Sequence, residues 1–506
     1  MASNQYYVTT PIYYVNDVPH LGHAYTSIAA DVLVRFYRMM GYDAMFLTGV
    51  DEHGQKVEKA AGKAGKSPQE FVDEVASSFE KLCGALNLSN DQFIRTTEDR
   101  HKKAAQAMWN RLVERGQIYK SSYKGWYSVR DETYFAESEL VDGKAPTGAD
   151  VEWVEEPSYF FKLSEWQEPL LKFYEENPDF IGPKSRRNEV ISFVKNGLMD
   201  LSISRSTFSW GVPVPDDPDH VMYVWIEALT NYLTALGFPD DSEGDVAAKW
   251  PVALHLIGKD ILRHHAVYWP AILLAAGLDV PKRIYAHGWW TREGQKMSKS
   301  LGNVIDPFAL VESHGLDQTR YFVMRQVTFG SDGDFSELAF ISRVNSDLAN
   351  DLGNLIQRVL SFIQKNAGAE VPTAAAYTDA DNAMLKQSRD LPEILHGHMD
   401  GQQIHKYCEV VWQVIGEANR YIDVQEPWAL RKTDTERMNT VLNVLVNVIR
   451  DVCVYAWPIM PDSMEKALSY LGVSGPVTLD LVKDPLKPGV SLPKPEGLFP
   501  RITETE

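Results

Sequence analysis

Apolar positions follow two alternating periods in the first part of the chain. Residues 6–10 and 43–49 are rich in β-branched and aromatic side chains, which is typical of buried strands. Residues 27–34 continue at helical spacing, and residues 67–70 form a capping box with proline in the first helical position. Strands that alternate with helices predict a doubly wound parallel sheet over residues 1–117, an α/β fold of the Rossmann type.

The pattern changes twice further along the chain. Residues 118–217 alternate aromatic and polar positions around a turn-rich centre, which predicts an inserted, strand-rich connective module. Alternation of strands and helices resumes over residues 218–325, beginning with the apolar run 220–225. Beyond a linker at 326–345, apolar residues recur on one helical face, so residues 346–506 are predicted to form an antiparallel all-α bundle.

Composition narrows the class of protein. Lys and Arg number 50 against 69 Asp and Glu, and this net charge of −19 argues against nucleic-acid binding by bulk charge alone. The three cysteines form no CxxC pair, so neither a disulfide framework nor a thiolate zinc site is expected. The chain shows no leader-like opening, and its apolar runs are too short to span a bilayer, which indicates a cytoplasmic protein without membrane contact.

Two histidines stand three residues apart where the first predicted strand gives way to a helix. His20 and His23 fall on one face of the first helical turn, where both imidazoles can donate to a phosphate oxygen. Gly22 removes a side chain where a ligand would approach the backbone, and a helix N-terminus favours anions. Taken alone, the pair is as consistent with two capping or surface histidines as with a catalytic pair.

Two lysines form a second candidate in GQKMSKSLGN, residues 294–303. Lys296 and Lys299 lie three apart and are flanked by Ser298, Ser300 and glycines, which on their own indicate a solvated basic loop. A histidine pair at a helix start and a loop with paired lysines are complementary cradles for one triphosphate. The two segments together therefore predict a single grip around the phosphates of ATP.

These segments resemble the two signature motifs of the class I aminoacyl-tRNA synthetases. The HIGH tetrapeptide of that family stands here as HLGH at residues 20–23, and the KMSKS motif is unaltered at residues 296–300. The resemblance implies activation of an amino acid, whose carboxylate attacks the α-phosphate of ATP, followed by acyl transfer to the terminal adenosine of a tRNA. Such catalysis is mainly positioning and charge stabilisation, and it needs no metal beyond the Mg²⁺ of ATP.

Longer segments resemble the methionyl-tRNA synthetases in particular. The resemblance runs from about residue 5 to about residue 460 and is carried by TTPIYYVNDVPHLGH, LTGVDEHGQKV, YVWIEAL, LIGKDILRHHAVYWPA and HGWWTREGQKMSKSLGN. It implies a methionine–tRNA ligase that uses L-methionine, ATP and tRNA(Met), including the initiator tRNA.

The resemblance also implies roles for individual residues. The catalytic ones are His20, His23, Lys296 and Lys299. The residues implied to bind ATP are His20, Gly22, His23, His287, Lys296, Met297, Ser298, Lys299 and Ser300. The residues implied to bind methionine are Ile12, Tyr14, Asp51, Trp225, Ala228, Tyr232, Ile261 and His265, with Asp51 facing the ammonium group. Aromatic rings suit a polarizable thioether and add about 0.3–1.5 kcal/mol per contact.

Each of these roles has a structural alternative. Trp225 and Tyr232 also lie at the spacing of an ordinary core stripe on a helix. His265 and His287 are of a type often found satisfied inside a core, and Asp51 fits a solvated turn equally well.

The helical C-terminal third resembles the anticodon-binding domain of the same family. Asn354, Arg358 and Trp428 match its anticodon-reading positions, and stacking on an exposed Trp is how unpaired bases are recognised. A Trp that follows a Pro at a helix start often only anchors the helix. Because the chain is acidic, we expect Arg431 and Lys432 to line one basic face.

The chain departs from some relatives and from other branches. It has no cysteine between residues 84 and 407, where many methionyl enzymes carry zinc knuckles, so no zinc is expected. A counterpart of the domain that dimerises some relatives is also lacking, which favours a monomer. The insertion is too short for the editing module of leucyl, isoleucyl or valyl enzymes, and the zinc thiolates of a cysteinyl enzyme are missing.

Two alternatives from other classes remain. Small nucleotidyltransferases share the HxGH logic, but they are far shorter and lack a helical bundle. A non-catalytic tRNA-binding relative is disfavoured because the histidines and lysines are intact.

Overall fold

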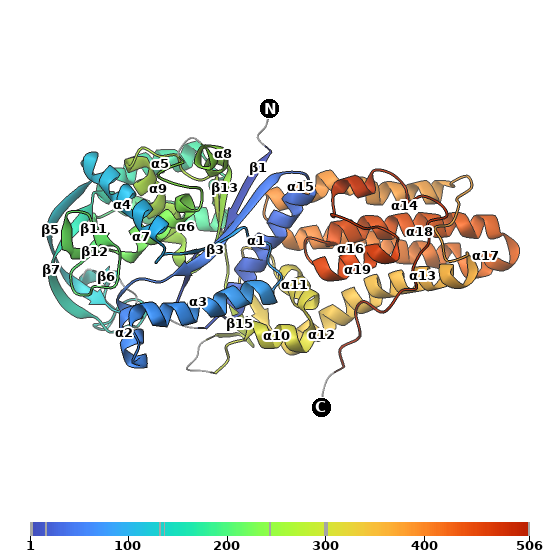
Figure 1. Ribbon diagram of the computed structural model, residues 1–506, viewed down its shortest axis with the longest axis horizontal. Helices are drawn as coiled ribbons and strands as arrows, with labels where there is room; N and C mark the ends of the chain where they lie inside the picture. The colour runs from blue at the N-terminus through green and yellow to red at the C-terminus, as the bar shows by residue number, and fades with distance from the viewer. Residues whose placement is uncertain are drawn as a thin grey trace.

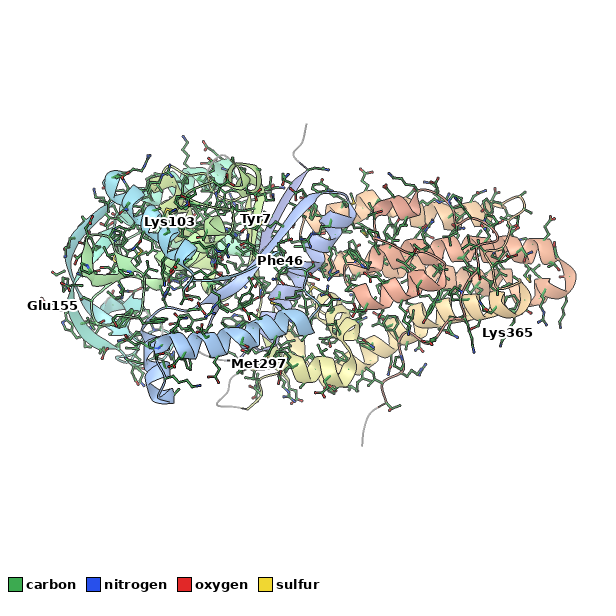
Figure 2. All side chains as sticks on the ribbon, viewed as in Figure 1. Tyr7, Phe46, Lys103, Glu155, Met297 and Lys365 are labelled. Atoms are coloured by element: carbon green, nitrogen blue, oxygen red, sulfur yellow. The ribbon has the colours of Figure 1, made fainter. Side chains whose placement is uncertain are left out.

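The computed structural model describes residues 4–15, 18–130, 133–135, 137–241, 244–297 and 302–503. The described chain forms an elongated molecule, with an α/β half at one end and a helical half at the other (Figure 1). Figure 2 labels Glu155 at the outer edge of the α/β half and Lys365 toward the far end of the helical half, so these two residues mark its long axis.

A parallel sheet forms the centre of the α/β half. In the described part of the chain it is seven-stranded, with neighbours paired in the order β4, β3, β1, β13, β14 and β8, and with β2 also beside β3. The strands are β1 (Gln5–Thr9), β2 (Tyr13–Tyr14), β3 (Asp43–Asp51), β4 (Gln92–Arg95), β8 (Ile181–Gly182), β13 (Ala253–Gly258) and β14 (Arg283–His287). Because β1 is followed by β3 on one side and meets β13 on the other, the topological switch lies between β1 and β13.

Helices cover both faces of this sheet, as the near-continuous apolar strands require. Alternate residues of β1 point to opposite faces: Tyr6 and Val8 belong to one buried cluster and Tyr7 to another. The helices of this half are α1 (Leu21–Met39), α2 (Gln55–Ala64), α3 (Pro68–Ala85), α4 (Asp99–Glu114), α7 (Val224–Thr234), α8 (Asp245–Lys249) and α9 (Trp269–Ala275). The predicted capping box is present at the start of α3, where Ser67 and Glu70 cap each other. The predicted doubly wound fold is confirmed.

The segment expected as a strand-rich insertion is more mixed than its sequence pattern suggested. Its main sheet is antiparallel in the order β6, β5, β7, β9, and a smaller sheet has the order β10, β12, β11. The strands are β5 (Ile118–Ser128), β6 (Thr133–Phe135), β7 (Glu152–Phe161), β9 (Leu201–Ser202), β10 (Ser204–Arg205), β11 (Pro213–Val214) and β12 (Asp217–Met222). The segment also contains α5 (Gln167–Glu176) and α6 (Lys184–Lys195), and it supplies β8 to the parallel sheet.

The alternation of strands and helices resumes at the apolar run 220–225, as expected. Its first part ends β12 in the small antiparallel sheet, and its second part begins α7. A short apolar run has no periodicity that distinguishes a parallel-sheet strand from an antiparallel one.

A small sheet and three helices connect the two halves. The sheet has the order β16, β15, β17, and its strands are β15 (Trp290–Arg292), β16 (Gln295–Lys296) and β17 (Gly333–Phe335). The helices are α10 (Pro307–His314), α11 (Leu316–Arg325) and α12 (Glu337–Arg343). The predicted linker at 326–345 therefore contains both a strand and a helix.

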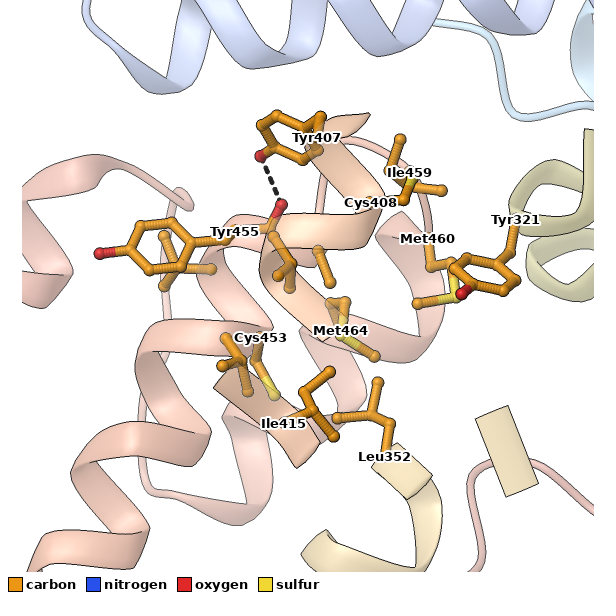
Figure 3. Packing of buried hydrophobic residues seen from close by; sticks show 14 of the residues in the cluster. Tyr321, Leu352, Tyr407, Cys408, Ile415, Cys453, Tyr455, Ile459, Met460 and Met464 are labelled. Atoms are coloured by element: carbon orange, nitrogen blue, oxygen red, sulfur yellow. Dashed lines mark hydrogen bonds between the residues drawn. The ribbon is translucent and has the colours of Figure 1, made fainter. Parts of the chain in front are cut away.

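Packed helices make up most of the remaining described chain up to Tyr470, as predicted, and residues 471–503 are largely irregular. A π-helical stretch, Val344–Gly353, leads into α13 (Asn354–Asn366), α14 (Asp379–Arg389), α15 (Leu391–Asp400), α16 (Ile404–Gln425), α17 (Pro427–Thr433), α18 (Thr435–Ala456) and α19 (Pro461–Tyr470). Figure 3 shows part of its core, where the Tyr407 hydroxyl donates to the Tyr455 carbonyl at 2.5 Å. Within the described ranges, no helix has both the length and the apolar content to cross a bilayer.

Short helical turns complete the described secondary structure. They are 3₁₀ turns at Glu137–Glu139, Leu163–Trp166, Trp250–Val252, Lys259–Ile261 and Leu479–Val482, and a π-helical turn at His264–Tyr268.

A buried ion pair joins the two halves. Arg320 on α11 donates to the Asp31 carboxylate on α1 at 2.7 Å, and its other N–H groups reach the carbonyls of Ile459, Pro458 and Leu86. Burial works to raise the pKa of Asp31, but the guanidinium groups of Arg320 and Arg35 hold it below its usual value. Asp31 therefore stays ionised inside the protein.

Replacing Arg320 with Met should leave Asp31 buried with half of its compensating charge removed. We expect the free energy of unfolding to fall by about 3–5 kcal/mol, as measured by urea denaturation. Arg420→Met removes an exposed pair with Glu417 and should change stability by less than about 0.5 kcal/mol. If both substitutions lower the free energy of unfolding by the same amount, the buried pair contributes no more to stability than an exposed pair.

Candidate active site

A cavity of about 630 Å³ opens at the carboxyl ends of β1 and β13, at the topological switch of the sheet. Every described residue that was predicted to bind ATP or methionine lines it. These residues are Ile12, Tyr14, His20, Gly22, His23, Asp51, Trp225, Ala228, Tyr232, Ile261, His265, His287, Lys296 and Met297. Ser298, Lys299 and Ser300 lie outside the described residues. The structure thus brings the histidine segment and the start of the lysine segment to one cleft.

The two histidines cap the helix on which they stand. The Nδ1 atom of His20 accepts the backbone N–H of Gly22 at 3.0 Å, and Nδ1 of His23 accepts the backbone N–H of His20 at 3.1 Å. An Nδ1 that accepts must be unprotonated, so in a neutral ring the proton is on Nε2. The capping role and the phosphate-binding role, which the sequence left as alternatives, are therefore compatible in the same side chains.

Burial keeps this part of the site uncharged. It lowers the pKa of His23 well below 6.5, and the neighbouring His20 adds to the effect through a stacked ring contact at 3.8 Å. His23 is then neutral at pH 7, and it can act on a phosphate as an N–H dipole. The N-terminus of α1 adds its own backbone dipole in the same place.

His287 lies at the end of β14 and is fixed on both ring nitrogens. Its Nδ1 donates to the carbonyl of Gly288 at 2.8 Å, and its Nε2 contacts the Thr26 hydroxyl on α1 at 2.7 Å. Burial lowers its pKa. The side chain is therefore a satisfied, neutral wall of the cavity between α1 and β14.

Lys296 lies on β16 at the rim of the same cavity. Its ammonium group is 4.3 Å from the ring centre of Trp289, and the ammonium group of Lys259 is 4.2 Å from that ring. Lys259 is held in turn by Asp332 at 2.7 Å, and the Trp289 indole donates to Asp260 at 3.0 Å. This fixed ring gives Lys296 a defined position beside the space where a triphosphate would lie.

Helix α7 presents an apolar and aromatic face to the cavity. Trp225, Ala228 and Tyr232 line it, so the core-like stripe of the sequence is one wall of the cleft. The Tyr232 hydroxyl contacts Nε2 of His265 at 2.7 Å, while Nδ1 of His265 donates to the carbonyl of Ile261 at 3.0 Å. The polar side-chain atoms of Tyr232 and His265 are thus paired, and the rings and methyl groups of this wall suit an apolar ligand.

Asp51 supplies a carboxylate to the same cavity. It is the last residue of β3 and is buried, which does not fit the alternative of a solvated turn. Ile12 and Tyr14 reach the cavity from the segment after β1, and Lys56 stands 5.3 Å from the Tyr14 ring. A ligand with an ammonium group and a short apolar chain could place the ammonium group near the Asp51 carboxylate and pack the apolar chain against α7.

Several lining residues were not among the predicted site residues. His264 stacks on Trp225 at 3.8 Å, and Trp289, Asp260 and Lys56 also line the cavity. In the sequence, His264 is next to the predicted residue His265, and Trp289 comes two positions after the predicted residue His287. Proximity to the motifs was the available signal, but it does not show which neighbour turns inward.

No metal centre is seen among the residues that the structure describes, because it places no group of three or more His, Cys, Asp or Glu side chains together as metal ligands. The expectation that the chain holds no zinc stays a prediction.

The predicted anticodon residues lie on the helical bundle. Asn354 begins α13 and is exposed, and Trp428 on α17 is 40% exposed. Arg358 stands 5.7 Å from the Trp428 ring and donates to Asp423 at 2.7 Å. The helix-anchor alternative for Trp428 is weakened, because much of its ring faces solvent. Arg431 lies on the same short helix, where its guanidinium group donates to the Asn366 side chain at 2.7 Å.

Comparison with known proteins identifies the family to which this chain belongs. A family model described as "tRNA synthetases class I (M)" matches residues 6–153 and 139–360, and a model described as "Anticodon binding domain of methionyl tRNA ligase" matches residues 371–506. The chain belongs to the methionyl branch of the class I aminoacyl-tRNA synthetases. The family predicted from the two signature motifs is therefore confirmed.

Relatives of this methionyl family match over nearly the whole chain. A methionine–tRNA ligase of Rickettsia felis is 54% identical and covers 99% of both chains, and one of Brucella suis is 53% identical over 100% of this chain and 99% of its own. The solved structure of the Mycobacterium tuberculosis methionyl-tRNA synthetase in complex with methionyl-adenylate is 50% identical, with a TM-score of 0.95 over 98% of this chain and all of that chain.

Acid should destabilise the protein through its buried histidines. Burial lowers the pKa of His265 from 6.5 to about 4, with the Ile261 carbonyl opposing the shift. Between these two pH values the unfolded chain binds a proton that the folded chain does not, so stability is lost as the pH falls from about 6.5 to about 4. One such histidine lowers the free energy of unfolding by roughly 2 kcal/mol when the pH falls from 7 to 5.

His265→Gln should remove that share of the acid sensitivity. The free energy of unfolding of the variant, measured by urea denaturation, should fall by roughly 2 kcal/mol less between pH 7 and pH 5 than that of the parent protein. The comparison uses the difference between the two pH values, so a general loss of stability does not affect it. An unchanged difference would contradict a neutral, buried His265.

Proposed function

We propose that this chain is a methionine–tRNA ligase that joins L-methionine to the 3′-terminal adenosine of tRNA(Met). The observation that carries the proposal is that one cavity is lined by the histidine segment, by Lys296 and Met297 at the start of the lysine segment, and by both a carboxylate and aromatic side chains. Family membership supports it, as does the methionyl-adenylate complex of the similar Mycobacterium tuberculosis enzyme. ATP and methionine are then the ligands of this cavity.

The first step joins methionine to AMP. A methionine carboxylate oxygen attacks the α-phosphorus of ATP, an O–P bond forms, and the bond between the α-phosphorus and its bridging oxygen breaks to release pyrophosphate. The Nε2–H groups of His20 and His23 and the ammonium group of Lys296 stabilise the charge that develops on the phosphates. Asp51 pairs with the substrate ammonium group, and Trp225 and Tyr232 pack on the thioether.

The second step transfers the methionyl group to tRNA. A ribose hydroxyl of the terminal adenosine attacks the acyl carbon, the bond between that carbon and the phosphate oxygen breaks, and AMP and the proton of the hydroxyl leave. No covalent intermediate with the protein is needed, so positioning accounts for most of the rate. The Mg²⁺ ion enters with ATP as part of the substrate.

The tRNA is held at a distance from this chemistry by the helical half. We infer that Asn354, Arg358 and Trp428 meet the anticodon, because a half-exposed ring with an adjacent guanidinium group suits the stacking of an unpaired base. Service of the initiator tRNA, the monomeric state and the cytoplasmic location remain predictions from the sequence, as do the domain boundaries set out above.

The purified protein should exchange labelled pyrophosphate into ATP when methionine is present. Leucine, valine and cysteine should give no exchange above background. Exchange that depends on one of these amino acids and not on methionine would overturn the substrate while leaving the family intact.

Lys296→Ala should slow this exchange by roughly 10–100-fold, because one charge-assisted contact to the phosphates is lost. The KM for methionine should stay nearly unchanged, since Lys296 does not lie on the methionine wall. Lys365→Ala, the same change at the exposed residue labelled on the bundle in Figure 2, should have no effect on exchange. A rise in the methionine KM equal to the loss in rate would instead place Lys296 in the shape of the amino-acid pocket.

Trp428→Ala should weaken charging of tRNA(Met) by roughly 5–150-fold, which corresponds to about 1–3 kcal/mol for one stacked base. Pyrophosphate exchange without tRNA serves as the internal control and should be unchanged. A loss of exchange would show that the residue acts through the stability of the fold.

A further inference from the structure

A fully buried carboxylate stands behind the methionine wall. One oxygen of Glu227 contacts Nδ1 of His53 at 3.1 Å, and the other contacts Nε2 of His101 at 2.8 Å. The Glu227 and His101 side chains have no exposed surface, and that of His53 has almost none. None of the three lines the cavity, so this cluster has no direct part in the chemistry set out above.

Glu227 lies on α7 but is not one of the α7 residues that line the cavity. At 100° per residue, position 227 is turned about 200° from Trp225, whereas Ala228 and Tyr232 return to the cavity face. The same helix therefore carries both the ligand wall and a buried carboxylate that does not reach the cavity. The contacts that hold Glu227 in place therefore also fix the position of the wall formed by Trp225, Ala228 and Tyr232.

His53 ties Glu227 to the segment that carries Asp51. It follows Asp51 by two residues, just beyond the end of β3. The Trp210 indole donates to the Glu52 carbonyl at 2.6 Å, and the backbone N–H of Glu52 donates to the Thr96 hydroxyl at 2.9 Å, so this segment is itself fixed. The contact between His53 and Glu227 thus joins the two groups that would meet opposite ends of the amino acid.

His101 ties the same carboxylate to α4. Its Nδ1 contacts the Thr234 hydroxyl at 3.2 Å, near the end of α7. Burial raises the pKa of Glu227, but the two imidazoles outweigh it and hold the pKa below its usual value, so the carboxylate is ionised. A buried charge with both oxygens engaged resists displacement, because any movement would leave it unpaired in a medium of low polarity.

We propose that Glu227 is a positioning residue that sets the span between Asp51 and the wall formed by Trp225 and Ala228, and thereby the length of side chain that the enzyme accepts. The proposal rests on the methionine-ligase function proposed above. Methionine and its homologue ethionine have the same number of bonds between the ammonium group and the sulfur, and ethionine carries one more methylene beyond the sulfur. A rigid span that fixes the ammonium group and the sulfur therefore also fixes the room left beyond the sulfur, which favours the methyl group of methionine over the ethyl group of ethionine. Pockets of this kind discriminate one methylene by about 10–200-fold.

The test compares methionine with L-ethionine in pyrophosphate exchange. Glu227→Gln keeps the volume of the side chain and removes its charge. We expect the KM for methionine to rise roughly tenfold, with kcat and the KM for ATP within about twofold, and the preference in kcat/KM for methionine over ethionine to fall at least about fivefold. His101→Asn should change the same quantities in the same direction, although it lies on α4 and does not line the cavity.

Asp381→Asn is the matched control, because it makes the same chemical change in an equally buried carboxylate. Asp381 lies in the helical bundle, where Arg437 and Tyr421 donate to it. This variant should lower the thermal midpoint and leave the methionine-to-ethionine preference unchanged. The contrast separates a span-setting role from a general loss of stability.

Three results are decisive. An unchanged preference in Glu227→Gln, or an equal change in Asp381→Asn, overturns the inference while the parent protein still shows methionine-dependent exchange. Absence of that exchange in the parent protein overturns the proposed function itself. If Glu227→Gln does not fold, His101→Asn decides the question, since it removes one of the two contacts and leaves the carboxylate in place.

Discussion

The buried pair between Arg320 and Asp31 is the interaction on which the arrangement of both halves depends. Asp31 lies on α1, the helix whose first turn carries His20 and His23, while Arg320 also holds the carbonyls that lead into α19 of the bundle. A charge buried at this depth is stable only while its partner and its hydrogen bonds are in place. The helix that presents the histidines and the bundle that carries Trp428 are therefore built on one rigid junction.

The end of the cavity where we propose that the phosphates bind combines neutral dipoles with a charge. His23 is uncharged because it is buried, and its Nδ1 is occupied in capping α1, so the geometry of the ring follows from the helix itself. A positive charge comes from Lys296, which rests beside Trp289 at the rim. This division fits a reaction in which charge moves among phosphate oxygens, because fixed donors need little reorganisation when it moves.

Local sequence patterns predicted a large part of this structure. Period and composition gave the strands β1 and β3, the helix that starts at residue 21 and the capping box at Ser67, since each depends on neighbours within one or two turns. The described residues implied by the two motifs line one cavity, and their catalytic and binding roles remain proposals. The sheet that the first part of run 220–225 joins could not be predicted from the run itself, because strand pairing depends on residues elsewhere in the chain, for example Ser204 with Met222.

The sequence by itself determined the elements, the family and the residues to consider, because short-range periodicity and motif spacing are written in consecutive positions. Only the tertiary structure decided that the α7 stripe lines the cavity, that His264 and Trp289 also line it, and that Glu227 meets His53 and His101. Glu227 and His53 are 174 positions apart. Contacts over such separations arise from the packing of whole elements, which leaves no periodic signal at either position.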